Sequence, residues 1–429
     1  MNATMNWFSE KLAPPLVRFT QMRLIAAILT GFMRVMPFLL VGAVFQILSN
    51  LLLIFAPTAT IPLAVMTNLT FGLLGMVLAY TIGAAVAEWH SLNAPLVGLF
   101  SIVVFLILTR PDFSNGAFLV SNFSLLGATG LFVAIVAALF TGEVIGLFYK
   151  QNWIIGGKGM PDFVAEWFAP LIPGTVVIVV AWLVAYVANV DLHTILATVM
   201  APVLQATDTY IGFVFICFLL TAVFAVGING AVFFGVLFPL WMAAVGENAG
   251  LVAQGLAPVH INTIQTLIGW VVIGGTGAPL ALVFLMQFSK STTIKSLGRV
   301  ALAPTLMNIS EPLVFGLPIA FNPILVIPYI INSGILNPTL VWLAMNFDLV
   351  TKPFVPAVIP WVPVGFSTFL FNQDWRGVVL LVIEIILNGL IWYPFLKAYE
   401  KILIARERAE AVEARAEGAA TASLAPAAR

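Results

Sequence analysis

GVVLLVIEIILNGLIWYPFLK, residues 377–397, is one of the apolar runs that decide the fold of this chain. A run of about 18 or more apolar residues predicts a membrane-spanning helix, because the hydrocarbon core of a bilayer is roughly 30 Å thick. The runs are continuous and do not alternate, which favours helices over a β-barrel. We therefore predict an all-α polytopic membrane protein with about ten transmembrane helices. The other nine crossings are expected at 25–54, 66–87, 95–109, 125–149, 171–189, 209–228, 229–245, 263–289 and 324–346.

The composition agrees with a membrane protein and excludes several classes of function. Of the 429 residues 61% are hydrophobic and 8% are charged, and the mean hydropathy is +1.08. The formal net charge is zero, so the charge balance predicts no nucleic-acid partner. With one cysteine, Cys217, and three histidines, the chain can form neither an internal disulfide nor a metal cluster. We predict no metal and no cofactor.

Basic residues between the apolar runs predict the orientation of the chain. Ten crossings place four groups of them on one side, the cytoplasm, together with both termini. We expect an amphipathic surface segment at 1–24, a second surface helix at 190–207 and a charged, Ala-rich cytoplasmic tail at 401–429. The four groups are Lys11, Arg18 and Arg23; Lys150 and Lys158; Lys290, Lys295 and Arg299; and Lys397, Lys401, Arg406 and Arg408.

The stretch MNISEPLVFGLPIAFNP, residues 307–323, places an acid where the backbone is least able to continue a helix. Pro312 disfavours a helix that runs through Glu311, and Pro318 repeats the interruption. Such a segment suits a re-entrant hairpin better than a crossing. A carboxylate at membrane depth indicates function by default. The alternative is a structural acid paired with Lys295 or Arg299.

Three further segments are broken in ways that leave two interpretations open. Asn229, between two glycines in 224–239, is either the tip of a helix hairpin or part of an unwound segment that faces a polar ligand. The glycines of 270–291 allow either close helix packing or a kink. Trp361, in the proline-rich segment 355–377, either stacks on a sugar ring or lies at the membrane interface. His260 is either interfacial or reaches a central cavity.

Motifs of this chain occur in an order that resembles the lactose/cellobiose/chitobiose family of phosphotransferase-system IIC sugar permeases. The resemblance covers about residues 20–401. Its motifs are LTGFMRVMPFLLVG (29–42), LLGATGLFVAIVAALFTGEV (125–144), WVVIGGTGAPLALVFLMQFSKS (270–291), SLGRVALAPTLMN (296–308), NISEPLVFGLPIAFNPILVIPYI (308–330), IPWVP (359–363), DWRG (374–377) and IWYPFLKAYEK (391–401).

This resemblance implies a homodimer in the bacterial cytoplasmic membrane, with about ten transmembrane helices and two re-entrant hairpins in each subunit. Residues 25–190 would form the dimerisation domain, and residues 191–400 would hold the sugar and move it across the membrane as an elevator. The glutamate of the family's N-x-x-E-P motif, Glu311 here, would lie in the sugar site and could assist as a general base. The phosphoryl donor would be a separate cytoplasmic IIB protein that carries a phosphocysteine.

Three departures from the family pattern fall in the expected sugar site. Asn229 stands where the family usually has histidine, and asparagine cannot shuttle a proton near neutral pH. Ser310 replaces the second asparagine of N-x-N-E-P, and the segment at Trp361 lacks the two threonines of W-T-T-P. These changes indicate a different substrate, or weakened or absent coupling to phosphorylation.

We predict a IIC-type permease that moves an oligosaccharide such as a β-linked disaccharide, coupled to a IIB protein. The alternatives are an uncoupled facilitator or transporter of another solute on the same fold, and a membrane sugar sensor. Glu311 is the candidate catalytic residue. The candidate substrate-binding residues are Asn229, Glu311, Asn308, Ser310, Asn248, His260 and Trp361.

Overall fold

The fold is given by a computed structural model, which describes residues 22–55, 62–113, 119–155, 164, 167–225, 233–317, 319, 322–359 and 362–423. Within these ranges the regular structure is helical, and an isolated bridge pairs Asp112 with Leu119. The predicted surface segment 1–24 lies mostly outside the described residues, as do Asn229 and Trp361.

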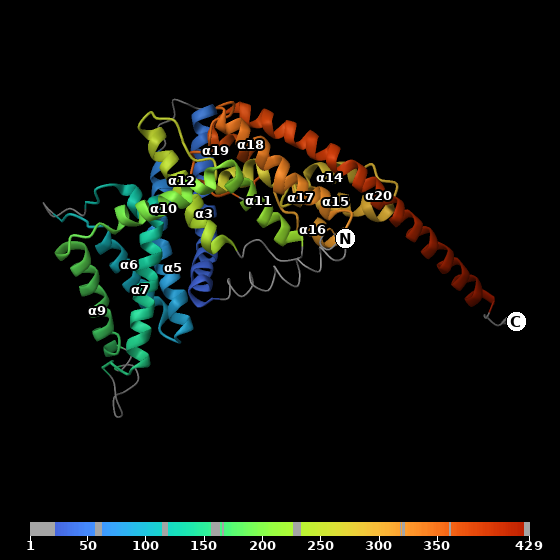
Figure 1. Ribbon diagram of the computed structural model, residues 1–429. Helices are drawn as coiled ribbons and strands as arrows, with labels where there is room; N and C mark the ends of the chain where they lie inside the picture. The colour runs from blue at the N-terminus through green and yellow to red at the C-terminus, as the bar shows by residue number, and fades with distance from the viewer. Residues whose placement is uncertain are drawn as a thin grey trace.

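The first half of the chain forms a bundle in which α5 packs against α3, α6 and α7 (Figure 1). Small residues allow this close packing, because a Cβ at Gly83 would lie 2.0 Å from the Ser101 hydroxyl oxygen of α6. The helices of this bundle are α3 (Arg23–Phe55), α4 (Ala64–Thr70), α5 (Leu74–Trp89), α6 (Ala94–Leu108), α7 (Leu131–Lys150) and α9 (Leu171–Trp182), with short turns η2 (Phe71–Leu73), η4 (Phe123–Leu126), η5 (Ala128–Gly130) and η6 (Leu183–Val187).

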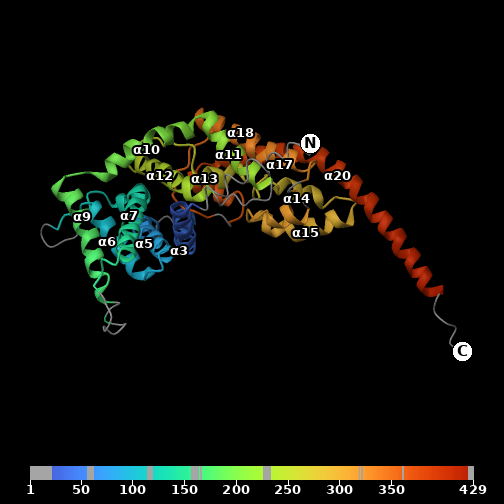
Figure 2. The ribbon, with the colours of Figure 1, turned by 60° about the horizontal axis from the view of Figure 1, so that its bottom comes forward.

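Helix α10 (Leu192–Asp208) links this bundle to the second half of the chain (Figure 2). It is bent by 84° from the preceding segment Leu171–Val187, and none of its residues is buried. The prediction of a surface helix at 190–207 agrees with this helix to within two residues.

The second half consists of shorter and more interrupted helices. Segment 263–289, predicted as a single crossing, is broken into α13, η8 and α14, and the intervening loop has positive φ at Gly274, Gly275 and Gly277. The elements are α11 (Tyr210–Ala225), α12 (Phe234–Ala253), α13 (Ile264–Thr266), η8 (Leu267–Val271), α14 (Leu280–Met286), α15 (Thr292–Leu306), α16 (Glu311–Gly316), α17 (Val326–Ile330), η9 (Ile331–Leu336), α18 (Asn337–Asn346), α19 (Phe366–Asn372) and α20 (Trp375–Ser423).

Helix occupies part of each of the ten predicted crossings. Among the described residues, five helices have by themselves the length and hydropathy to cross a membrane, and the bent α9–α10 pair passes the same test only as a unit. The crossing predicted at 229–245 is misplaced, because α12 runs to Ala253. The polar residues Glu247 and Asn248 interrupt the apolar run, and so the hydropathy pattern did not predict this end of α12. The five helices are Val65–Trp89, Ala128–Lys150, Val236–Ala253, Val326–Asn346 and Trp375–Ala409.

Helix α20 continues the last crossing by several turns and carries the described chain away from the body of the molecule (Figure 1). Where α20 leaves the body of the molecule, two of its carboxylates bind the N-terminus of α15. Glu400 accepts hydrogen bonds from the Ser289 hydroxyl at 2.5 Å and the Lys290 backbone N–H at 2.6 Å. Glu407 accepts from the Ser291 hydroxyl at 2.7 Å and the Thr293 N–H at 3.0 Å. These carboxylates satisfy donors at the α15 N-terminus.

Candidate functional site

A sharp turn between α15 and α16 presents Glu311. Asn308 adopts a left-handed conformation (φ 59°), and Pro312 occupies the first turn of α16, where a missing N–H is tolerated. Ser310 is buried, with 4% of its surface exposed, whereas Glu311 is exposed. The expected break in the helix at Pro312 is therefore present, and it leaves the carboxylate on the open side of the turn.

Asn308 fixes this turn against the broken helix 264–286. Its Oδ1 accepts a hydrogen bond from the Gly274 N–H at 2.7 Å, and its Nδ2 donates to the Ile268 carbonyl at 3.1 Å. Gly275, with φ +105°, lies so close that a Cβ there would be 2.4 Å from the Ser310 Cβ. The glycines of this segment therefore provide both a kink and close packing, the two interpretations that the sequence left open.

The Glu311 carboxylate itself makes no hydrogen bond or ion pair within the described part of the chain. The alternative of a structural acid paired with Lys295 or Arg299 is not observed there. Since Asn308 uses both ends of its amide on the backbone, it positions the turn, and Glu311 is the group left free to bind a ligand.

Asn248 and His260 form a second group, in which Asn248 is fully engaged. Asn248 is wholly buried, and its Nδ2 donates to the carbonyls of His260 (2.8 Å) and Pro353 (2.7 Å). Its Oδ1 accepts from the N–H groups of Val259 and His260, both at 2.9 Å. An amide that makes four backbone hydrogen bonds has no capacity left for a sugar hydroxyl. The interpretation of Asn248 as a direct ligand is not supported, and its geometry is that of a clamp.

His260 is held between two acids that sequence reasoning did not select. Its Nδ1 contacts Asp208 Oδ2, and its Nε2 lies 2.9 Å from Glu247 Oε2. Burial lowers the pKa of His260, but the hydrogen bonds and charges of Asp208 and Glu247 outweigh it, so that the pKa is raised above its usual value. Asp208 lies 52 positions before His260 in the sequence. The one local signal for Asp208 was its position next to the end of the surface helix predicted at 190–207.

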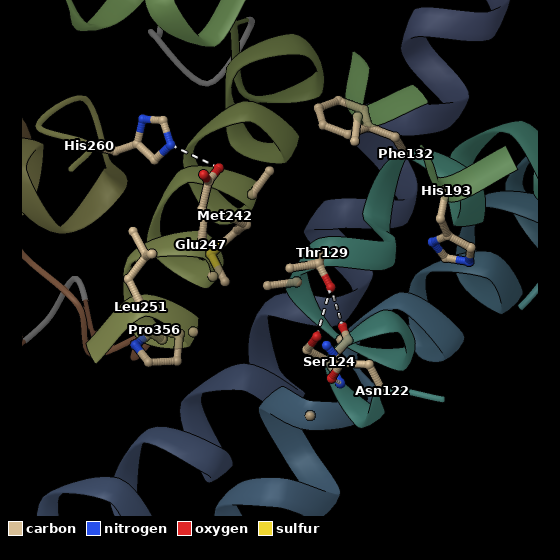
Figure 3. Close-up of a pocket in the computed structure, with 18 of the residues that line it drawn as sticks. Asn122, Ser124, Thr129, Phe132, His193, Met242, Glu247, Leu251, His260 and Pro356 are labelled. Carbon is tan, nitrogen blue, oxygen red and sulfur yellow. Dashed lines mark hydrogen bonds and ion pairs between the residues drawn. The ribbon is translucent and has the colours of Figure 1, made fainter. Parts of the chain in front are cut away.

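His260 and Glu247 line a cavity of about 900 Å³ between α12 on one side and α10 with the 122–133 segment on the other (Figure 3). Figure 3 shows Glu247 and His260 on one wall, and His193, Thr129 and Asn122 across the opening. His260 thus lines a cavity beside α10, the helix that links the two halves of the chain. The lining is mixed in character, with amides and the Glu247 carboxylate beside Phe, Leu and Met side chains.

A third group of charged residues forms ion pairs between helices of the first bundle, joining α3 to α5 and α7. Arg23 donates to both Glu143 oxygens at 2.7 and 2.8 Å, and His90 Nε2 lies 3.2 Å from Glu143. Arg34 pairs with Glu88 at 2.7 Å. Glu143 thus joins α7 to the start of α3.

Comparison with known proteins identifies the family. Residues 29–333 match the family model described as Phosphotransferase system, EIIC. This chain belongs to that family. The Lichenan permease IIC component of Bacillus subtilis (strain 168) is 31% identical over 429 residues, and the match covers 94% of each chain. The cellobiose-specific EIIC component of Geobacillus stearothermophilus is 29% identical, with 96% of this chain and 97% of that one covered.

The fold of an EIIC protein is found in a solved structure as well. The transporter ChbC, the IIC component from the N,N'-diacetylchitobiose-specific phosphotransferase system, superposes with a TM-score of 0.84 at 28% identity. The match covers 94% of this chain and 99% of ChbC. The resemblance stated from the motifs is thus confirmed: the chain is an EIIC sugar permease, a membrane protein that works with IIB components.

Proposed function

We propose that this EIIC chain carries an oligosaccharide, first of all a β-linked disaccharide, into the bacterial cell. The relatives named above are assigned to lichenan, cellobiose and N,N'-diacetylchitobiose. The last two are β-linked disaccharides, and the match to their permeases extends over nearly the whole chain. The substrate class rests on this extended similarity.

The observation that carries the assignment of the site is the free carboxylate of Glu311. It is exposed and unpaired in the described chain, while the residues around it are used to hold the turn. A carboxylate in such a position accepts hydrogen bonds from sugar hydroxyls and can take a proton from the hydroxyl that receives phosphate. We assign the sugar contact and the general-base role to Glu311, with Ser310 beside it and Asn308 as the positioning residue.

Asn229 and Trp361 complete this proposed site from segments outside the described residues. Asparagine donates and accepts hydrogen bonds but cannot exchange a proton near neutral pH, so Asn229 would bind a hydroxyl and leave proton transfer to Glu311. The indole of Trp361 would stack on the apolar face of a sugar ring. Asn248 and His260 are assigned to the support of the cavity wall formed by α12 and the 259–262 segment, and not to sugar contact.

We further propose the assembly in which the permease works. A separate IIB protein carrying a phosphocysteine would phosphorylate the sugar at the cytoplasmic face, where both termini would lie. Two chains would form a homodimer through residues 25–190, and residues 191–400 would move the sugar. Helix α10, which has no buried residue and joins both halves, suits a connection that adjusts as one half moves.

Calorimetric titration of the purified protein with a panel of disaccharides tests the substrate class. Cellobiose and N,N'-diacetylchitobiose should release heat with a saturable isotherm, and α-linked maltose should not. Binding of maltose alone, or of none of the sugars, would contradict the proposed class. Whether bound sugar is moved and phosphorylated is a separate question.

A further inference from the structure

Three polar side chains lie in a row on the buried face of α20. Glu384, Asn388 and Trp392 are spaced by four residues, so that they follow one another along one side of the helix. Their exposed fractions are 0%, 1% and 0%. Within the described chain, neither Glu384 oxygen, neither amide atom of Asn388 and not the indole Nε1 of Trp392 has a hydrogen-bond partner.

Within the described chain, the helices with the most extensive contacts to α20 carry no charge. The elements with the most extensive contacts to α20 are η8, α14, α17, α18 and α19, and their sequences contain no Asp, Glu, Lys, Arg or His. Tyr329 of α17 is the one titratable residue among them. Helix α15, which carries Lys295 and Arg299, is bonded to α20 at Glu407, roughly 34 Å along the helix axis from Glu384. Along α20 the nearest charged residues are Arg376 and Lys397, which lie roughly 12 and 20 Å from Glu384 by the helical rise.

The segments missing from the description between 226 and 361 add no charge either. Residues 226–232, 318, 320–321 and 360–361 are all uncharged in the sequence. A carboxylate anion buried without a counter-ion or donors is strongly disfavoured, and a carboxyl group in such a place stays neutral. The neutral acid has one O–H donor and still needs a partner for it.

The spacing of the row suits water as that partner. Successive members are separated by roughly 6 Å along the helix axis, and a buried water typically makes about three hydrogen bonds to groups that are otherwise unsatisfied. We propose that Glu384, Asn388 and Trp392 form an internal site for a proton and ordered water, in which Glu384 is a neutral carboxylic acid. The site is separate from the Glu311 turn, and it does not depend on which sugar is carried.

Infrared spectroscopy of the full-length protein in lipid vesicles at neutral pH tests this site directly. The wild-type protein should show the C=O stretching band of a protonated carboxylic acid. The band should shift in D2O and disappear in Glu384→Gln. Glu88→Gln is the matched control, because it removes a half-exposed carboxyl that pairs with Arg34 at 2.7 Å, and it should leave the band in place.

Two further measurements keep the proposal falsifiable. If Glu384→Gln does not fold, wild-type protein labelled with ¹³C-glutamate must still show a label-sensitive acid band at neutral pH. Absence of that band, or its persistence in folded Glu384→Gln, would overturn the proton site. Asn388→Leu should move the Glu384 band by removing a partner of the shared water, and an unmoved band would overturn the water bridge.

Discussion

Asp208 joins the end of α10 to the segment that carries His260. One Asp208 oxygen contacts His260 Nδ1, and the other accepts the backbone N–H groups of Ile261 and Asn262 at 2.9 and 2.7 Å. The Trp342 indole donates to the Asp208 carbonyl at 2.8 Å. The exposed helix that links the two halves of the permease is therefore fastened at its end to α18 and to the connection between α12 and α13.

His260 should make the stability of this junction depend on pH. Its pKa is raised in the folded protein, so its contribution is fully present below the unfolded value of about 6.5 and is lost as pH rises through the folded pKa. The apparent Tm of the wild type should therefore fall relative to His260→Gln as pH rises through this window. Thermal unfolding followed by tryptophan fluorescence measures the difference. A difference that does not vary with pH would contradict the ion-pair role of His260.

Asn248→Ala should destabilise the protein without removing a sugar contact. The substitution removes the partner of two carbonyls and two N–H groups, and each of the three buried groups left unpaired costs about 1–3 kcal/mol. We expect a loss of about 3 kcal/mol or more after relaxation. The control is Gln254→Ala, an exposed amide with one bond to the Gly250 carbonyl, which should change stability by less than about 0.5 kcal/mol. Equal midpoints of denaturation for the two variants would rule out the clamp.

The sequence predicted the helical membrane fold well, because apolar runs and their breaks are local signals. Pro312 and the glycines at 274–277 were also sufficient to predict interrupted backbone near Glu311. The role of Asn248 could not be predicted, since its partners lie as far away as Pro353 and are backbone atoms, which carry no residue-type signal. The Asp208–His260 contact was missed for the same reason of distance along the chain. Glu384 lies in the crossing predicted at 377–397, but its isolation depends on which helices pack around it, which the sequence does not show.

Gly275→Ala tests the close approach that holds the Glu311 turn. Alanine at φ +105° is strained, and its Cβ would clash with Ser310, so both stability and sugar binding should fall. Gly250→Ala is the matched control, because a Cβ added there, in the last turn of α12, would meet nothing within 4 Å. It should stabilise the protein by about 0.5–1 kcal/mol and leave sugar affinity unchanged. If the two substitutions behave alike, the packing of Gly275 on Ser310 does not support the site.

Glu311→Gln should remove sugar binding while the protein stays folded and dimeric. Replacing a charged hydrogen bond to a sugar hydroxyl by a neutral one costs about 1–1.5 kcal/mol, so two such bonds correspond to roughly 30- to 150-fold in Kd. Calorimetry with cellobiose measures the affinity, and gel filtration with light scattering measures the mass. Glu247→Gln serves as the control, because Glu247 lies on α12 beside His260 and away from the Glu311 turn. This variant should bind sugar normally. Unchanged affinity in Glu311→Gln would exclude Glu311 from the site.

The central claim, that this EIIC chain delivers sugar to a IIB protein for phosphorylation, is tested most directly by following labelled sugar into proteoliposomes. Radiolabelled cellobiose is offered outside, with phosphorylated IIB enclosed in one set of vesicles and unphosphorylated IIB in the other. We predict that labelled sugar phosphate accumulates in the first set and not in the second. Label that enters both sets at the same rate, and is never recovered as sugar phosphate, would contradict the account and indicate an uncoupled facilitator.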